Sequence, residues 1–216
     1  MFVRDIMTRD PVTVRPGSDP LAALAILKCA PFRRLPVIDA DGSLVGLVAA
    51  SDLEVFLTKA GSPGVMKRQH RVDQVAVGAV VTVAPDCPLE EAAVLMIENK
   101  IGSLPVVEAN RLVGIVTDTD ILGQFARALG AGTDWLRLTV QVPNVQGQLA
   151  DLTSRIAQEG GNVTSVVAAD ADDPRWTNVV LRVQDASREA VLYAVEGHPA
   201  VRVLHVWERD EAVPEG

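Results

Sequence analysis

The side chains best suited to binding a ligand lie in two short polar runs, each directly after an apolar stretch that contains a glycine. Thr117–Asp120 follows Leu112–Val116, and Ser51–Asp52 follows Leu44–Val48. Hydroxyl groups, a carboxylate and the free N–H groups of a helix start are partners that phosphate and ribose require. The same groups can also do no more than cap a helix. Taken singly, either run leaves both interpretations open.

The two runs belong to an internal repeat. Asp52 and Asp120 are 68 residues apart, and Pro36 and Pro105, which lie in two L-P-V triplets, are 69 residues apart. Self-similarity at a fixed period indicates repeated structural units. Because several motifs recur in nearly one register, the repeat favours a binding role for both polar runs.

Each copy of the repeat predicts the same series of elements. Hydrophobic pattern and turn residues indicate a short strand, a helix, a β-hairpin and a closing helix. In the first copy these are expected at residues 11–14, 21–29, 33–48 and 52–58, and in the second at 80–83, 89–99, 103–117 and 120–129. Between the copies, Gly61–Gly64 and the basic residues Lys67, Arg68, His70 and Arg71 are expected to form a solvated linker, with phosphate contact as the alternative.

The paired V-T-V, L-P-V and L-V-G-(I/L)-V motifs, with T-D-T-D after the second copy, resemble tandem cystathionine β-synthase (CBS) domains, which together form a Bateman module. The resemblance covers residues 1–126. It implies α/β (α+β) architecture: two βαββα units at residues 1–60 and 75–130, joined by a linker at 61–74 and packed sheet to sheet. It also implies two clefts, related by pseudo-two-fold symmetry, that bind an adenine nucleotide or a similar adenosyl ligand.

Carried over to this sequence, the resemblance implies a first cleft that combines the polar run of the second copy with residues of the first copy. Asp120 would accept both ribose hydroxyls, the threonine hydroxyls would meet phosphate, and an arginine would supply positive charge. The residues of this first cleft are Val12, Thr13, Arg33, Arg34, Leu35, Thr117, Thr119 and Asp120.

The second cleft departs from this pattern. Ala49 stands where the other copy has Thr117, and Gly102 and Ser103 stand where it has arginines. We therefore expect weaker phosphate binding there, or none, although adenosine would still fit. The residues of this second cleft are Ser51, Asp52, Val81, Thr82, Gly102, Ser103 and Leu104.

The remainder of the chain predicts a separate βαββαβ domain at residues 135–208, followed by a frayed tail at 209–216. Strand and helix order, and the V-P-N-V-Q-G-Q-L-A-D-L run after the first strand, resemble an ACT domain, a regulatory fold that often binds amino acids. Loop N–H groups near Gly147 could receive a carboxylate, and Asn144 could bind an ammonium group. Gln146 and Asn144 depart from the family's D-x-P-G loop. Amino-acid binding and dimerisation alone both stay open.

Composition and motifs limit the functions available. A net charge of −8 argues against a general nucleic-acid-binding role, and no apolar run is long enough for a transmembrane helix, so neither nucleic acid nor membrane is expected as a partner. No secretory signal is visible, which favours the cytoplasm. Cys29 and Cys87 have no metal-ligand spacing and are interpreted as reduced structural thiols, and no metal is expected.

No catalytic motif was found, and the histidines His70, His198 and His205 show no ligand spacing. The chain is therefore interpreted as a non-enzymatic, homodimeric sensor that needs no cofactor and uses an adenine nucleotide as its regulatory ligand. The order CBS-CBS-ACT resembles bacterial acetoin-utilisation regulators, with the regulated protein partner unknown. The alternative is a ligand-free dimeric interaction scaffold in which the polar runs only cap helices.

Overall fold

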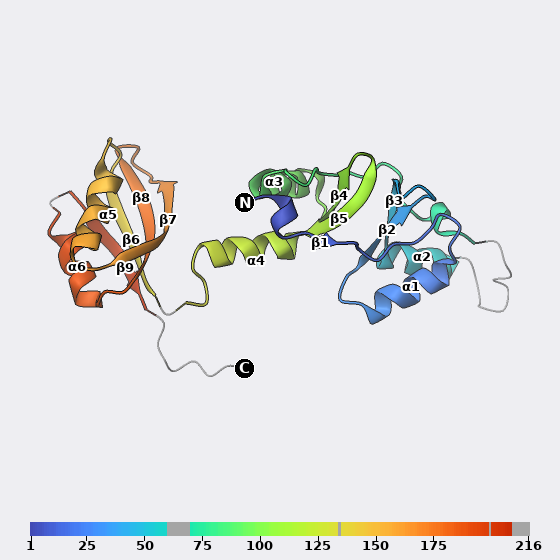
Figure 1. The fold of residues 1–216 in the computed structure, drawn as a ribbon, viewed down its shortest axis with the longest axis horizontal. Helices are drawn as coiled ribbons and strands as arrows, with labels where there is room; N and C mark the ends of the chain where they lie inside the picture. Colours follow the sequence, from blue (N-terminus) through green and yellow to red (C-terminus); the bar gives the residue numbers. More distant parts are fainter. Residues whose placement is uncertain (60–69, 134, 199, 209–216) are drawn as a thin grey trace. The chain divides into compact units, whose positions relative to one another are not determined.

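The computed structural model describes residues 1–59, 70–133, 135–198 and 200–208, so the expected tail and most of the expected linker lie outside the described residues (Figure 1). The chain divides into two compact units, Met1–Leu122 and Gly123–Gly216. The first unit contains the two repeats, and the second contains the βαββαβ segment. Among the described residues, none of the helices combines the length and apolar character that crossing a bilayer requires.

The first repeat is a β-hairpin flanked by two helices. Its helix α1 begins where the sequence indicates, because the Asp19 carboxylate accepts a hydrogen bond from the Leu21 N–H at 2.9 Å and a proline occupies the first helical position. The elements are η1 (Val3–Asp5), β1 (Thr8–Arg9), α1 (Pro20–Cys29), β2 (Arg34–Ile38), β3 (Leu44–Ala49) and α2 (Ala50–Lys59).

The second repeat copies this plan, as the internal repeat predicts. Its elements are η2 (Val72–Gln74), α3 (Leu89–Asn99), β4 (Ser103–Glu108), β5 (Arg111–Thr117) and α4 (Asp118–Ala128). Even the irregularities recur: the register shifts between Val37 and Ile38 in the first hairpin and between Val106 and Val107 in the second. A shared bulge means that the two hairpins bend at the same place.

The two repeats exchange their first residues. The Val3 N–H donates to the carbonyl of Cys87 at 2.9 Å, and at the equivalent position the Val72 N–H donates to the carbonyl of Ser18 at 3.0 Å. Strand β1 pairs with β5 of the other repeat. Val72 is fully buried in the core cluster of the first repeat. Each repeat is therefore completed by the start of the other.

This exchange accounts for the glycine in both L-V-G motifs. A Cβ on Gly114 would lie 2.6 Å from Met7 Sδ and 3.0 Å from the carbonyl oxygen of Thr8, both in the segment that crosses from the first repeat. A Cβ on Gly46 would lie 3.2 Å from the carbonyl oxygen of Val77, which crosses from the second. The exchanged segments approach the hairpins so closely that only glycine leaves enough space.

Two details of the sequence prediction differ from the structure. Residues 11–14 and 80–83 do not form strands, because only Val14 and Val83 make isolated parallel bridges to their own hairpins while the chain crosses between the repeats. Residues 72–74, expected in the linker, form the helical turn η2, and the exchange buries Val72.

The second unit is a four-stranded antiparallel sheet with the strand order β7-β8-β6-β9. This order and the βαββαβ sequence of elements are those of the ferredoxin-like plan. Apolar residues of the two helices, including Leu152, Ile156 and Val191, join alternate residues of β6 and β8 in one core cluster. The elements are β6 (Leu136–Pro143), α5 (Gln148–Gln158), β7 (Asn162–Asp170), β8 (Trp176–Gln184), α6 (Arg188–Glu196) and β9 (Arg202–Trp207).

Candidate ligand-binding clefts

Three of the predicted cleft residues, Arg34, Ser103 and Thr117, lie at the open ends of the two hairpins. Arg34 pairs with Ala49 in the first hairpin, and Ser103 pairs with Thr117 in the second, so each strand pair ends beside the polar run that follows it. The backbones match: the Ala50 N–H donates to the carbonyl of Arg33 at 3.1 Å, and the equivalent bond from Asp118 to Gly102 measures 3.2 Å. The two ends share one backbone geometry but differ in chemistry.

At the second hairpin end, Thr117 and Asp120 cap each other. Asp120 Oδ2 accepts hydrogen bonds from the Thr117 N–H at 2.9 Å and from its hydroxyl at 2.7 Å, while the Asp120 N–H donates to Thr117 Oγ1 at 3.2 Å. The Thr119 N–H and hydroxyl both donate to Asp118 Oδ1, at 2.7 and 3.2 Å. The capping function weighed in the sequence is therefore present in this structure, and a ligand would have to share or replace these hydrogen bonds.

The two hairpin ends also touch each other. Arg34 Nη1 donates to the hydroxyl of Ser103 at 3.3 Å, although the sequence assigns these residues to different clefts. A Cβ on Gly102 would lie 2.8 Å from Asp118 Oδ2 and 3.5 Å from Arg34 Nη1. The guanidinium of the first repeat and the carboxylate of the second therefore converge over Gly102. Sequence reasoning did not select Asp118, although it lies within the T-D-T-D run.

The other predicted cleft residues differ widely in exposure. Leu35 and Leu104 are fully buried core residues, whereas Ser51, Asp52 and Val12 are exposed. Thr13 and Val81 are partly buried, and Arg33 and Thr82 are exposed. Assignment of these residues to a cleft stays a prediction.

A hollow of about 230 Å³ lies elsewhere in the first unit, at the turn ends of the two hairpins. Of the predicted residues it contains Thr82 alone, and its lining is Ser43, Leu44, Gly78, Val80, Thr82, Val107 and Asn110. None of these side chains is charged, so the hollow does not provide the carboxylate and cation that a phosphorylated nucleoside requires. We therefore place the candidate site at the hairpin ends and not in this hollow.

In the second unit, the candidate amino-acid loop lies between β6 and α5. Gly147 has φ +88°, a conformation that favours glycine, and begins helix α5. The Asn144 amide donates to the carbonyl of Pro174 at 3.3 Å, so it braces the turn between β7 and β8. Gln146 is exposed. Sequence reasoning missed Gln148, whose buried Oε1 has no hydrogen-bond partner in the described part of the chain.

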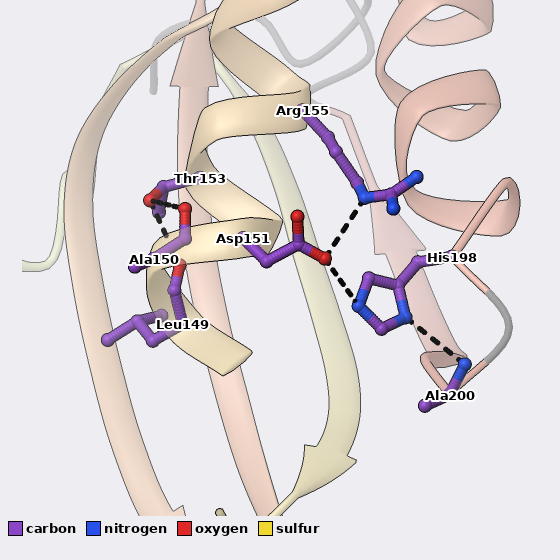
Figure 2. Close-up of polar contacts among 7 residues, drawn as sticks. All are labelled: Leu149, Ala150, Asp151, Thr153, Arg155, His198 and Ala200. Carbon is purple, nitrogen blue, oxygen red and sulfur yellow. Dashed lines mark hydrogen bonds and ion pairs between the residues drawn. The ribbon is translucent and has the colours of Figure 1, made fainter. Parts of the chain in front are cut away.

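His198 connects two helices of this unit (Figure 2). It is 7% exposed; its Nε2 lies 2.7 Å from Asp151 Oδ2, and its Nδ1 accepts a hydrogen bond from the Ala200 N–H at 3.1 Å. Since Nδ1 is an acceptor, Nε2 carries the proton and donates to Asp151. Arg155 Nε also donates to Asp151 Oδ2, at 3.2 Å. Both ring nitrogens thus have partners within the second unit, and the ring links α5 to the segment after α6.

The clearest pKa changes lie outside the predicted clefts. Burial and the nearby carboxylates of Glu91, Asp86 and Glu90 raise the pKa of the Cys87 thiol above its usual 9.0. A side-chain hydrogen bond from Arg175 lowers the pKa of Asp173 to about 2. No group of three or more histidine, cysteine, aspartate or glutamate side chains in the described ranges could hold a metal ion.

Comparison with known families agrees with the two-repeat architecture. A family model described as the CBS domain matches residues 3–58 and again residues 72–127. The chain belongs to the CBS-domain family. A CBS domain-containing protein of Dictyostelium discoideum is 32% identical over 136 residues, which are 60% of this CBS protein and 94% of that relative. A homoserine O-acetyltransferase of Methanohalobium evestigatum is 31% identical, but the match spans only 23% of the enzyme.

Solved structures support the same assignment for this CBS protein. A Vibrio cholerae protein described as a putative acetoin utilisation protein (AcuB) has a TM-score of 0.54 and 32% identity, with 60% of this chain and 93% of that chain covered. The CBS domain pair of protein MJ0100, solved with 5′-methylthioadenosine and S-adenosylmethionine, has a TM-score of 0.51 and 28% identity, covering 59% and 97%. CBSX2 in complex with AMP has a TM-score of 0.52 and 29% identity, covering 58% and 96%.

Proposed function

We propose that this CBS protein is a non-enzymatic regulatory protein that binds an adenosine-type ligand at the hairpin ends of its CBS pair. The observation that carries the proposal is the geometry of the two hairpin ends, which have the same backbone hydrogen bonds. At each end, the first residue of one strand, Arg34 or Ser103, lies beside the carboxylate-containing run that follows the other strand. Two similar CBS pairs were solved with adenosyl ligands, AMP in one and S-adenosylmethionine with 5′-methylthioadenosine in the other.

In the proposed first cleft, Asp120 accepts hydrogen bonds from the ribose hydroxyls, and Thr117 and Thr119 contact the phosphate. These side chains now bond to each other and to Asp118, so a ligand exchanges internal hydrogen bonds for its own. A carboxylate acceptor suits vicinal hydroxyl donors, and helix α4 begins beside them. The first three N–H groups of α4 donate to Gly102 O, Asp118 Oδ1 and Thr117 Oγ1, so a phosphate would have to replace these acceptors. In the second cleft, Ser51 and Asp52 take the equivalent places.

We further propose that the second unit is an ACT domain. Its strand order and element sequence fit that regulatory fold. The unsatisfied Gln148 Oε1 at the start of α5 is suited to accept a hydrogen bond from an ammonium group, beside loop N–H groups that suit a carboxylate. An amino acid is the ligand that offers both groups. The proposed protein is a cytoplasmic homodimer that dimerises through this unit. Its likeness to AcuB suggests acetoin utilisation as the pathway to test.

One observation favours a second function. The reciprocal capping of Thr117 and Asp120 satisfies these groups without any ligand. A protein whose clefts serve only as helix starts would be a dimeric interaction scaffold. The two proposals predict different results in a binding measurement. A sensor is stabilised by its nucleotide, whereas a scaffold gains no stability from one.

The test is a thermal-shift panel with AMP, ADP, ATP, S-adenosylmethionine and 5′-methylthioadenosine. A ligand at about a hundred times its Kd stabilises the folded state by about 2.7 kcal/mol, which moves Tm by several degrees. In Asp120→Ala we expect AMP affinity to fall about ten- to a hundredfold, the effect of losing a charged acceptor. Because the sequence gives the second cleft no arginine, the sequence alone predicts a smaller effect of Asp52→Ala on AMP binding.

Because Asp120 also caps helix α4, Asp120→Asn separates binding from folding. Asparagine keeps an oxygen that can accept the hydrogen bonds from the Thr117 N–H and hydroxyl, but it lacks one of the two carboxylate acceptors. Asp41→Ala, at an exposed hairpin turn, is the matched control. If no adenosyl compound shifts the parent, the scaffold replaces the sensor. If Asp120→Asn binds AMP as the parent does, the site assignment is wrong.

A further inference from the structure

The hairpin ends assign the two adjacent arginines to different clefts. The sequence places Arg33 and Arg34 together in the first cleft and leaves the second without a cation. In the structure, Arg34 Nη1 donates to the hydroxyl of Ser103, a residue of the second cleft, at 3.3 Å. Ser103 is buried and Arg34 is partly buried, so this contact fixes the direction of the arginine side chain.

The Arg34 side chain lies against two small residues of the second repeat. Gly102 and Ser103 occupy the positions equivalent to Arg33 and Arg34, 69 residues later. A Cβ on Gly102 would be in ordinary van der Waals contact with Arg34 Nη1, at 3.5 Å, but too close to Asp118 Oδ2, at 2.8 Å, so the glycine makes room for the carboxylate beside the guanidinium. The second repeat therefore has no arginine at these two positions, and the arginine of the first repeat contacts it there.

The Arg33 side chain is not expected to point toward Ser103 as Arg34 does. Arg34 is the first residue of β2, and successive side chains along an extended strand point to opposite sides. Arg33 is exposed, and Arg34 is not. Arg33, which precedes β2, therefore has different surroundings from Arg34, whose guanidinium points toward Ser103.

We infer that Arg34 provides the positive charge of the second cleft and that Arg33 provides that of the first. This inference rests on the proposed function and revises its ligand class, because both clefts then accept a phosphorylated adenosyl ligand such as AMP. With Nη1 held by Ser103, Arg34 keeps its Nε and Nη2 donors for two parallel hydrogen bonds to a phosphate. The Asp118 carboxylate lies beside Gly102 near the Arg34 guanidinium, and its negative charge would repel a phosphate bound there.

The experiment is isothermal titration of the full-length protein with AMP, using single and double variants. The parent is expected to bind two AMP molecules per chain. Arg34→Met and Asp52→Ala should weaken the same site about ten- to a hundredfold, the effect of losing a charged partner. Arg33→Met and Asp120→Ala should weaken the other. Arg34→Met combined with Asp52→Ala should leave one intact site, and combined with Asp120→Ala should leave none.

Three further arms separate charge from structure. Binding of 5′-methylthioadenosine, which has no phosphate, should be unchanged in Arg34→Met. Asp118→Asn should strengthen AMP binding at the second site, because it removes a negative charge beside Gly102. Arg111→Gln removes an exposed arginine at the far end of β5 and serves as the charge-matched control.

The outcomes are distinct. If Arg34→Met and Asp120→Ala weaken one and the same site, Arg34 belongs to the first cleft and the inference is overturned. A parent that binds a single AMP also overturns it, while leaving the proposed function standing. A parent that binds neither AMP nor 5′-methylthioadenosine refutes the proposed function and the inference with it.

Discussion

His198 shows how hydrogen-bond partners decide the function of a single residue. The sequence places this histidine at a helix end and gives no reason to expect burial. In the structure one ring nitrogen donates to Asp151 and the other accepts from a backbone N–H, so the ring joins the first turn of α5 to the segment after α6. A buried histidine held by two such partners stabilises the fold.

Removing Asp151 should therefore destabilise the second unit. In Asp151→Ala the buried Nε2–H of His198 loses its acceptor, at a cost of about 1–3 kcal/mol, and toward the lower end because Asp151 is itself half exposed. Asp151→Asn keeps an acceptor oxygen and should recover most of the loss. Urea unfolding gives these values, with Ser154→Ala on the exposed side of the same helix as control. Equal stability of Asp151→Ala and Ser154→Ala would show that the contact contributes nothing.

The two cysteines should react at different rates. Cys29 is exposed, whereas burial and three neighbouring carboxylates raise the pKa of Cys87. Because the thiolate is the reactive form, iodoacetamide at pH 8 is expected to alkylate Cys29 first, and the alkylation rate of Cys87 should continue to increase with pH beyond 9.0. Peptide mass spectrometry over time measures both rates. Faster alkylation of Cys87 at pH 8 would contradict its environment as described.

At the scale of elements, the glycines of the two hairpins define how closely the exchanged segments approach. A Cβ added to Gly114 would meet a backbone oxygen and a sulfur of the crossing segment, while a Cβ added to Gly46 would have slightly more space. Gly123, inside helix α4, has no neighbour within 4 Å of an added Cβ. Position in the fold, and not the residue type, therefore sets the effect of adding one methyl group.

Three alanine substitutions test this ordering. Gly114→Ala should destabilise the first unit by about 1–3 kcal/mol through overpacking, and Gly46→Ala by less. Gly123→Ala should stabilise by about 0.5–1 kcal/mol, since alanine favours a helix interior over glycine. Thermal or urea unfolding measures all three changes. A neutral Gly114→Ala would mean that β1 does not press against β5.

The sequence predicts where helices and strands lie far better than it predicts which distant segments pack against them. Helix α3 spans the predicted residues because its apolar period and the preceding proline turn are local signals. The exchange of Thr8–Arg9 onto β5 has no such signal, since register between distant segments depends on packing. The same limit applies at the site. Residue types indicate phosphate and ribose partners, but only the contact with Ser103 shows the direction of Arg34.

For the first unit as a whole, the exchange predicts that damage at one repeat appears in the other. Val3 and Val72 are equivalent and fully buried, and each contacts the opposite repeat. In Val3→Ala, hydrogen exchange should increase mainly in α3 and β5, and in Val72→Ala mainly in α1 and β3, because the lost contacts lie there. Mass spectrometry of peptic fragments measures the pattern. Faster hydrogen exchange confined to the mutated repeat would contradict the swapping of first segments between the repeats.

The exchange also bears on how such a chain could arise. A single repeat made alone would have an unfilled groove beside its hairpin and a first segment with nowhere to pack. A second copy of that repeat supplies both missing partners, so the ancestral unit is expected to have been a dimer. Gene duplication and fusion would then join two subunits that already depended on each other, after which their hairpin ends could diverge into one basic and one acidic half.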